Sequence, residues 1–301
     1  MLYSSSLLAI VGAGEQPSLS PRRLCLFNST TGTSLRELNF LTSILAVRLN
    51  KKRLVVVLQE KTFIYDSNSL AILDTIDTIP NPKGLCAFSP SLDGCFLALP
   101  ASTSKGSVLL YNVMEVHLHC EVVVDNDAHR APLAAMSLSS SGTYVATASE
   151  QGTIIRVHHV LDATKLPDIL VATSSSGSVH AFPLSMAVNQ RGKRSTSFLG
   201  SILPDSVNDA LDPAYHHVLH RAVPAGVRSY VVVRKVEKAA EAPATHVAIG
   251  LRATLAVINY NGYFQEYILD FNGPSDPKWS LEREFNLLAA RSGNEQHFQM
   301  V

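Results

Sequence analysis

The stretch that decides the fold is Tyr144–Val157, which reads YVATASEQGTIIRV. An apolar run, Tyr144–Ala148, is followed by a polar segment and then by a second run, Gly152–Val157. Valine, isoleucine, threonine and tyrosine in the runs favour strands, whereas the serine and glycine between them favour a turn. The stretch therefore predicts a β-hairpin.

The same pattern recurs along the chain, with first strands that begin near residues 7, 54, 96, 144, 169 and 247. Strand-rich units about 40–45 residues apart are typical of the blades of a β-propeller. A β-sandwich is the alternative, but it would place turns every ~8–12 residues without the longer period. The paired runs are 7–11 with 24–27, 54–58 with 62–65, 96–99 with 106–111, 144–148 with 152–157, 169–173 with 177–182, and 247–250 with 254–259.

Two steps between these repeats depart from one blade length. The step from 144 to 169 is too short by about two strands, and the step from 169 to 247 is too long. The excess lies in residues 185–224, where serine, proline, asparagine, aspartate and basic residues accumulate. The sequence therefore predicts an incomplete, all-β WD-type propeller of about five to six blades over residues 1–270. It also predicts an inserted loop over 185–224 and a polar C-terminal tail over 271–301.

Composition narrows the function classes. The formal net charge of the 301 residues is zero, so no general attraction to nucleic acid or anionic lipid is expected. The scattered cysteines favour a reduced, cytoplasmic protein, no apolar run predicts a membrane span, and the apolar start at Leu2–Val11 does not resemble a signal peptide. No nucleophile elbow, phosphate-binding glycine loop or carboxylate pair occurs. We therefore expect a protein that is not an enzyme, with no cofactor and no small-molecule substrate.

Two groups of histidine and cysteine residues raise the hypothesis of a zinc site. Histidine and cysteine gather at His117, His119 and Cys120, and again at His158 and His159. Alternating histidines do not reproduce the spacing of four-ligand zinc sites, so the sequence predicts no metal.

Three segments resemble one family closely. Asn81–Ala87, Ala128–Met136 and Ala146–Val157 are similar to the PROPPIN (WIPI) family of WD-repeat β-propellers, especially to plant members. The resemblance covers nearly all of residues 1–270. It implies a propeller that has seven blades in the family. It also implies binding of phosphatidylinositol 3-phosphate and phosphatidylinositol 3,5-bisphosphate at two rim pockets.

The resemblance also assigns the pocket residues. Arginine, hydroxyl and imidazole groups are the side chains that phosphate groups require. The alternative is that these polar groups hold a blade together or form an ordinary polar turn. The first pocket would use His129, Ser149, Thr153 and Arg156, and the second Ser174, Ser178 and His180.

This chain departs from the family at two places. The family has a Phe-Arg-Arg-Gly motif between the pockets, which should follow Asp162–Lys165 but does not. The chain also begins at a point that resembles the second blade. Loss of one charged hydrogen-bond partner costs about 1.5–3 kcal/mol, so each pocket is expected to bind more weakly.

The insertion carries a second membrane feature. Leu203, Val207 and Leu211 recur at helical spacing and Pro204 suits the first helical turn, which together predict a short amphipathic helix. The segment resembles the family loop that inserts into bilayers, although a helix packed on the propeller, or a disordered loop, is the alternative. The residues expected to enter the bilayer are Phe198, Leu199, Ile202, Leu203, Val207 and Leu211.

The leading hypothesis is a phosphoinositide-binding scaffold of autophagosome formation and of endolysosomal or vacuolar traffic, with weakened lipid binding. It would be cytoplasmic and peripheral on preautophagosomal, endosomal or vacuolar membranes. An autophagy lipid-transfer protein would dock on the Pro17–Arg22 loop through Pro21 and Arg22. The alternative is a protein-interaction propeller without effective lipid binding, in a truncated or splice variant.

Overall fold

A computed structural model describes residues 6–16, 19–91, 95–115, 129–160, 169–184, 216–238, 251–271 and 278–289. These residues form six antiparallel sheets of three or four strands, and neighbouring strands in each sheet are consecutive along the chain. The chain divides into two compact units, Met1–Lys165 (unit 1) and Leu166–Val301 (unit 2). The predicted gap in the repeat, after Lys165, coincides with the boundary between the units.

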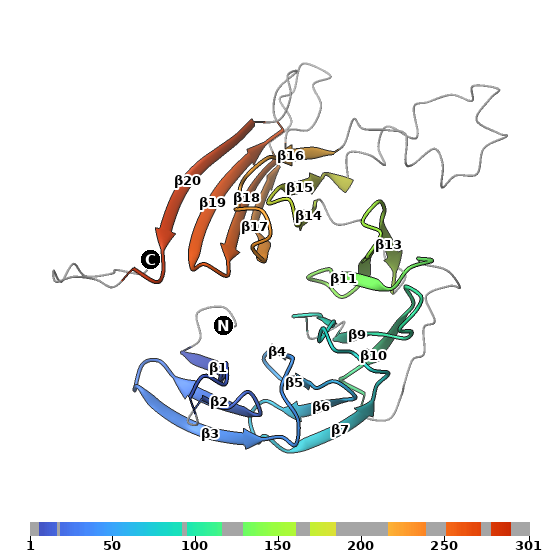
Figure 1. Cartoon of the computed structure of the whole chain (residues 1–301), viewed down its shortest axis with the longest axis vertical. Helices are drawn as coiled ribbons and strands as arrows, with labels where there is room; N and C mark the ends of the chain where they lie inside the picture. The colour runs from blue at the N-terminus through green and yellow to red at the C-terminus, as the bar shows by residue number, and fades with distance from the viewer. Residues whose placement is uncertain are drawn as a thin grey trace. The chain divides into compact units, whose positions relative to one another are not determined.

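Unit 1 holds four of the sheets, coloured from blue to green in Figure 1. They are β1–β2–β3, β4–β5–β6–β7, β8–β9–β10 and β11–β12–β13. Their strands are β1 (Leu7–Val11), β2 (Arg23–Asn28), β3 (Thr33–Asn39), β4 (Ala46–Leu49), β5 (Arg53–Val57), β6 (Lys61–Asp66), β7 (Ile72–Asp77), β8 (Ala87–Phe88), β9 (Phe96–Pro100), β10 (Val108–Asn112), β11 (Leu133–Leu138), β12 (Tyr144–Ser149) and β13 (Ile155–His159).

Strand β5 shows why these sheets pack face to face. All five of its residues are buried, so both faces of the strand lie in a core. Leu54 and Val56 belong to a cluster shared with the β1–β3 sheet, whereas Val55 and Val57 belong to one shared with β9. Each fully buried side chain of this kind contributes about 1.5–3 kcal/mol. A strand that is apolar on both faces is therefore the inner part of a sheet between two others.

Strand β9 repeats this arrangement one sheet further along. Leu97 and Leu99 point into the cluster shared with β5, and Ala98 points into a cluster with Leu133 and Val145 of the next sheet. The sheets of unit 1 are thus joined in chain order by three successive cores. This succession is the arrangement of propeller blades.

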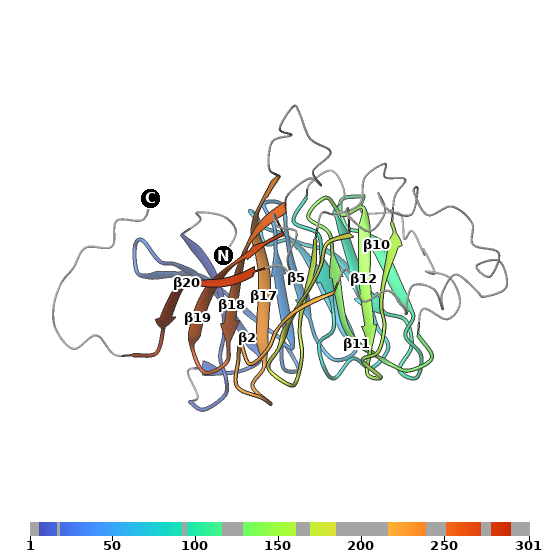
Figure 2. The same ribbon diagram turned by 90° about the horizontal axis from the view of Figure 1, so that it is seen from above.

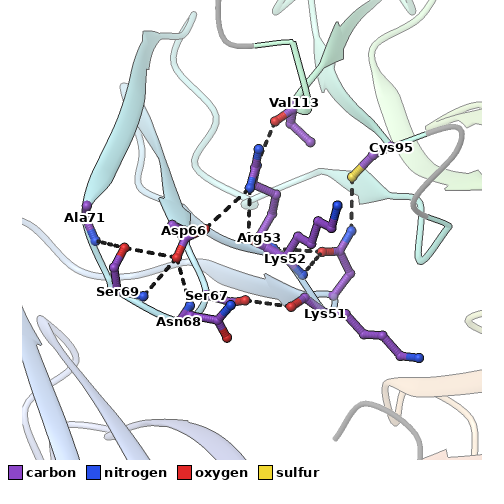
Figure 3. A network of polar contacts seen from close by, with 11 residues as sticks. Lys51, Lys52, Arg53, Asp66, Ser67, Asn68, Ser69, Ala71, Cys95 and Val113 are labelled. Carbon is purple, nitrogen blue, oxygen red and sulfur yellow. Dashed lines mark hydrogen bonds and ion pairs between the residues drawn. The ribbon is translucent and has the colours of Figure 1, made fainter.

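A polar network fastens the β5–β6 hairpin to the following sheet (Figure 3). Arg53 Nε donates to the carbonyl oxygen of Val113 at 2.9 Å, and its Nη1 lies 3.7 Å from Asp66 Oδ2. Asn50 Nδ2 lies 3.0 Å from the buried Cys95 Sγ. Burial raises the pKa of the Cys95 thiol, which keeps it protonated and unreactive. The network is therefore structural.

Unit 2 holds the three-stranded sheet β14–β15–β16 and the four-stranded sheet β17–β20, whose strands lie side by side in Figure 2. In β18, Leu251, Ala253, Leu255 and Val257 are buried and alternate with more exposed residues, and the last three form one core with β15. The strands are β14 (Leu170–Thr173), β15 (Val179–Phe182), β16 (His217–Leu219), β17 (Ser229–Lys238), β18 (Leu251–Asn259), β19 (Tyr263–Asp270) and β20 (Lys278–Asn286).

Three boundaries differ from those expected from sequence. β16 lies inside the segment expected as an insertion and pairs with β15, and β20 lies inside the expected tail and pairs with β19. Polar residues such as those of β20 suit an exposed edge strand, because only one of its edges is paired. The hairpin expected from the runs 247–250 and 254–259 is wrong, because the residues expected to form its turn belong to one continuous strand, Leu251–Asn259. Residues 247–250 lie outside the described residues.

The other five expected hairpins are confirmed as antiparallel pairs: β1 with β2, β5 with β6, β9 with β10, β12 with β13, and β14 with β15. Within the described part of the chain, no helix has the length and apolar character needed to cross a membrane.

Candidate functional site

The first predicted pocket lies on the β11–β13 sheet of unit 1, which we call site one. His129 precedes β11, Ser149 is the last residue of β12, Thr153 lies in the turn and Arg156 lies on β13. Ser149 and His129 are buried, whereas Thr153 is exposed. The order of strand, turn and strand expected from sequence is therefore present.

His129 orients Arg156 directly. Arg156 Nη1 lies 3.0 Å from His129 Nδ1, and His129 Nε2 lies 3.0 Å from Thr147 Oγ1. A guanidinium can only donate hydrogen bonds, so Nδ1 must accept. Its proton therefore sits on Nε2 and is donated to the buried Thr147 hydroxyl. This assignment requires a neutral imidazole.

Electrostatics agree with this protonation state. Burial lowers the pKa of His129, and the positive charge of Arg156 lowers it further. Burial likewise lowers the pKa of His158, with added contributions from Arg156 and His129. Both rings are therefore neutral at pH 7, and Arg156 is the permanent cation of site one.

The sequence analysis did not identify two members of this cluster. Thr147 lies opposite Arg156 in the β12–β13 register and so shares its face, which strand alternation could have indicated. His158 was considered only as a zinc ligand; its Nε2 is buried and has no hydrogen-bond partner among the described residues. Within those residues, no hydrogen bond joins Ser149 or Thr153 to His129 or Arg156.

The second predicted pocket lies on the β14–β16 sheet of unit 2, which we call site two. Ser174 Oγ is 2.6 Å from Ser176 Oγ, which in turn donates to Ser178 Oγ at 3.3 Å. The backbone N–H of Ser178 also donates to Ser174 Oγ at 3.3 Å. The tight turn thus gathers three hydroxyls, of which Ser176 was not predicted.

His180 of site two contacts a second imidazole. Its Nδ1 lies 2.7 Å from Nε2 of His216, and the two rings are nearly parallel, with 5.0 Å between centroids. Phe182 stacks on His216 at 4.6 Å. Burial lowers the pKa of His180, followed by the charges of His216 and His220. His216, 36 residues along the chain, is the contact that sequence reasoning missed.

The turns of the two sites have the same design. Gly152 donates to the Ser149 carbonyl at 3.0 Å and Gly177 to the Ser174 carbonyl at 3.1 Å. Both glycines have a positive backbone angle φ, 69° and 81°. Residues with a β-carbon rarely adopt this conformation, so glycine suits both turns.

The partner loop is described in part. The Pro21 and Arg22 carbonyls accept hydrogen bonds from Ile44 and Phe40, at 2.8 and 2.9 Å, and Arg22 is exposed. Residues 17 and 18 of that loop lie outside the described residues. So do the residues expected to enter the bilayer, Phe198, Leu199, Ile202, Leu203, Val207 and Leu211.

The residues of the zinc hypothesis lie largely outside the described part of the chain. Those outside it are His117, His119 and Cys120. Among the residues that the structure describes, no cluster of three or more histidine, cysteine or acidic residues could hold a metal.

Solved structures define the class of fold. KlAtg21, in its complex with the coiled-coil of AgAtg16, superposes with a TM-score of 0.66 at 18% identity, over 95% of this chain and 84% of that one. Kluyveromyces lactis Hsv2 gives a TM-score of 0.63 at 16% identity, over 95% and 85%. The protein is an all-β chain of the β-propeller class, as predicted, although none of the sheets formed by the described residues closes on itself.

Sequence comparisons define the family. A model described as PROPPIN matches residues 1–190. Autophagy-related protein 18b of Arabidopsis thaliana is 65% identical, over 97% of this chain and 85% of that protein. Autophagy-related protein 18 of Dictyostelium discoideum is 30% identical over 96% and 82%. The chain belongs to the PROPPIN family, and its relatives support a role in autophagy.

Coverage is uneven among the relatives. Autophagy-related protein 18 of Aspergillus terreus is 36% identical over 64% of this chain but only 54% of that protein. The chain thus spans about half the length of this fungal relative.

Proposed function

We propose that this protein is a phosphoinositide-binding, non-enzymatic scaffold of autophagosome formation and of endolysosomal or vacuolar traffic. The lipids would be phosphatidylinositol 3-phosphate and phosphatidylinositol 3,5-bisphosphate. The observation that carries the proposal is the hydrogen bond from Arg156 to the buried, neutral His129. It holds a permanent cation in one orientation beside a turn with the Thr153 hydroxyl.

The chemistry of Arg156 suits a phosphate group. A guanidinium offers several N–H donors in a fixed plane and stays charged at any physiological pH. Only one Arg156 donor is occupied by His129 among the described contacts, at 3.0 Å. The remaining donors could take two oxygens of one phosphate, and such charge-assisted bonds are roughly twice as strong as neutral ones.

Site two would hold a second headgroup. The hydroxyls of Ser174, Ser176 and Ser178 lie within a few residues of His180 and supply neutral donors. Two weak sites on one protein gain affinity together when they bind one membrane, because the second contact is intramolecular.

Membrane and partner contacts would complete the scaffold. The segment with Phe198, Leu199, Ile202, Leu203, Val207 and Leu211 would add apolar insertion. Pro21 and the exposed Arg22 lie on a loop that the segment after β3 holds by backbone hydrogen bonds, which suits docking of an autophagy lipid-transfer protein. The protein would be cytoplasmic and peripheral on preautophagosomal, endosomal or vacuolar membranes.

One observation favours a second candidate function. The sequence contains no Phe-Arg-Arg-Gly motif, and the segment after Lys165 continues as Leu-Pro-Asp-Ile. Without those arginines the chain could act as a protein-interaction propeller that binds lipid too weakly to depend on it. The two candidates differ in one measurable quantity, the vesicle affinity of the chain itself.

The test is co-sedimentation of the full chain with phosphatidylcholine vesicles, with and without phosphatidylinositol 3-phosphate. We expect specific binding that Arg156→Ala weakens by roughly 10- to 100-fold, because a charged hydrogen bond contributes about 1.5–3 kcal/mol. Arg36→Ala, at an exposed position on β3, is the matched control and should bind like the natural chain.

A further variant separates the candidates. It carries Phe-Arg-Arg-Gly inserted after Lys165. If only this variant binds the lipid-containing vesicles, the protein-interaction function is correct for the chain as it stands.

A further inference from the structure

Three histidines of unit 2 lie on one side of the β14–β16 sheet. In β15, Val179 and Ala181 point into the core, so Ser178, His180 and Phe182 share the opposite face. Around β16, Leu219 packs against that core, and the alternation places His216 and His220 on the other side, with His180. Both His216 and His220 are exposed to solvent.

The His180–His216 contact restricts protonation. With 2.7 Å between Nδ1 and Nε2, one ring must donate and the other must accept. The pair can therefore carry no more than one added proton without losing the bond and placing two like charges together. Such a pair is neutral, or it is an imidazole–imidazolium with a single positive charge.

The surroundings of the pair do not supply that charge. Ala172 of β14 and Val218 of β16 lie opposite His180 in the sheet, and neither is charged. The groups that influence the charge of His180 are His216 and His220, both of which disfavour its protonation. Burial acts in the same direction, so His180 is neutral at pH 7 in the absence of a ligand.

We propose that His180 and His216 together form a proton-linked site for a phosphomonoester, which captures one proton between the two imidazoles as the dianion binds. The proposal rests on the proposed function of site two and adds His216 and the coupled proton to it. The nearby hydroxyl of Ser178, on the same face, would donate to the phosphate oxygens. The pair would supply at site two the positive charge that Arg156 supplies at site one.

The required proton fixes the direction in which the binding affinity of site two changes with pH. Because the bound dianion stabilises the charged pair, the bound state holds more protons than the free state, and affinity rises as the pH falls. Uptake of one proton changes the affinity by up to about tenfold per pH unit between the free and bound pKa values. We therefore expect binding at site two to strengthen between about pH 7.5 and pH 6, by less than this limit, because the free phosphomonoester itself begins to take up a proton near pH 6.

The first experiment uses a soluble probe, inositol 1,3-bisphosphate, with the full chain. Histidine ring resonances are followed by NMR at several pH values, and calorimetry in two buffers of different ionisation enthalpy counts the protons taken up. The natural chain should bind with proton uptake, and the His180 and His216 resonances should titrate at higher pH when the probe is present. Unshifted resonances, or binding without proton uptake, would overturn the proposal.

Two variants at His216 separate charge from packing. His216→Phe retains the stack on Phe182 and removes the nitrogen, and His216→Gln retains a hydrogen-bonding group that does not titrate. Both should remove the proton uptake and the pH dependence at site two. His220→Gln is the matched comparison, since it changes only a neighbouring charge and should keep most of the pH dependence. Unchanged proton uptake in both His216 variants would contradict the proposal.

The second experiment repeats the pH series with phosphatidylcholine vesicles that contain phosphatidylinositol 3-phosphate. Proton-linked binding of the soluble probe without vesicle binding would support the site for free phosphomonoesters and contradict the proposed membrane function. Vesicle binding that His216→Phe leaves equally strong at every pH would support the membrane function and overturn the proton-linked site.

Discussion

Sites one and two use similar hairpins but obtain positive charge differently. Site one has the turn Ser149–Gly152 and a permanently charged arginine that a neutral histidine orients. Site two has the turn Ser174–Gly177 and an imidazole pair that is charged only after taking up a proton. The comparison shows that the hairpin is a shared frame, whereas the residue that it places on the next strand decides the electrostatics.

The two turns also differ in their surroundings. A β-carbon at Gly152 would meet no atom within 4 Å, but one at Gly177 would lie 1.9 Å from the carbonyl oxygen of Val223. The Gly177 carbonyl accepts a hydrogen bond from Val223 N at 3.0 Å, so the two segments are tied together. Site two is therefore braced by a neighbouring segment, and the turn of site one is open.

The largest expected effect is that of Gly177→Ala compared with Gly152→Ala. Both changes put a side chain at positive φ, which costs about 1–2 kcal/mol. Gly177→Ala adds overlap with backbone, so its total cost should exceed that of Gly152→Ala by about 1–3 kcal/mol. Urea unfolding of the two variants, followed by circular dichroism, which reports the strands of both units, measures the difference. Equal costs would show that Val223 moves away freely.

His129→Phe should have the next largest effect. It leaves the Thr147 hydroxyl without its partner and frees the Arg156 side chain, which together should cost about 1–3 kcal/mol at pH 7. Vesicle affinity at site one should fall as well, because Arg156 loses its orientation. Urea unfolding followed by circular dichroism measures the stability. A stable variant with unchanged vesicle binding would show that Arg156 does not depend on His129 for its orientation.

The same variant tests the pH dependence of stability. The folded pKa of His129 lies below its ordinary value near 6.5, so at pH below about 6.5 the unfolded chain binds a proton that the folded chain does not. The free energy of unfolding therefore falls as the pH falls from 7 to 5, and His158 and His180 act in the same direction. His129→Phe should make this slope shallower. A slope that stays the same would contradict a neutral, buried His129.

The smallest expected effect is that of Thr147→Val. The change removes the acceptor for His129 Nε2 but leaves the shape of the side chain nearly intact. We expect a loss of about 1 kcal/mol in unfolding free energy and a change in vesicle affinity of only a few-fold. Ser139→Ala, in the turn between β11 and β12 of the same sheet, is the comparison; it removes a half-buried hydroxyl that contacts Ser141 Oγ and accepts from the Tyr144 N–H.

Sites one and two should respond to acid in opposite ways, which gives the sharpest comparison between them. Acid should weaken the fold around site one, because His129 must stay neutral to hold Arg156. Acid should strengthen anion binding at site two, because the His180–His216 pair needs a proton to become positive. Vesicle binding of Arg156→Ala and His216→Phe, compared at about pH 7.5 and pH 6, reports each site in the absence of the other's cation.

Much of the fold could be predicted because strand alternation and turn residues are local properties. The pairs β5–β6, β9–β10 and β12–β13 follow directly from short apolar runs with turns between them. The edge strands β16 and β20 could not be predicted, since the three residues of β16 are too few to show alternation and the polar residues of β20 match those of loops. They form strands only because β15 and β19 offer unpaired backbone groups beside them.

The sequence by itself determined the repeated hairpins, the family, and the positions of His129, Arg156 and His180 on or beside their strands. Only the tertiary structure decided that Arg156 donates to His129, that Thr147 takes the other ring nitrogen, and that His180 meets His216. The physical reason is that alternation tells which face a residue occupies, whereas its partner depends on which distant strand lies opposite. Protonation follows from those partners, and it is protonation that distinguishes the two sites.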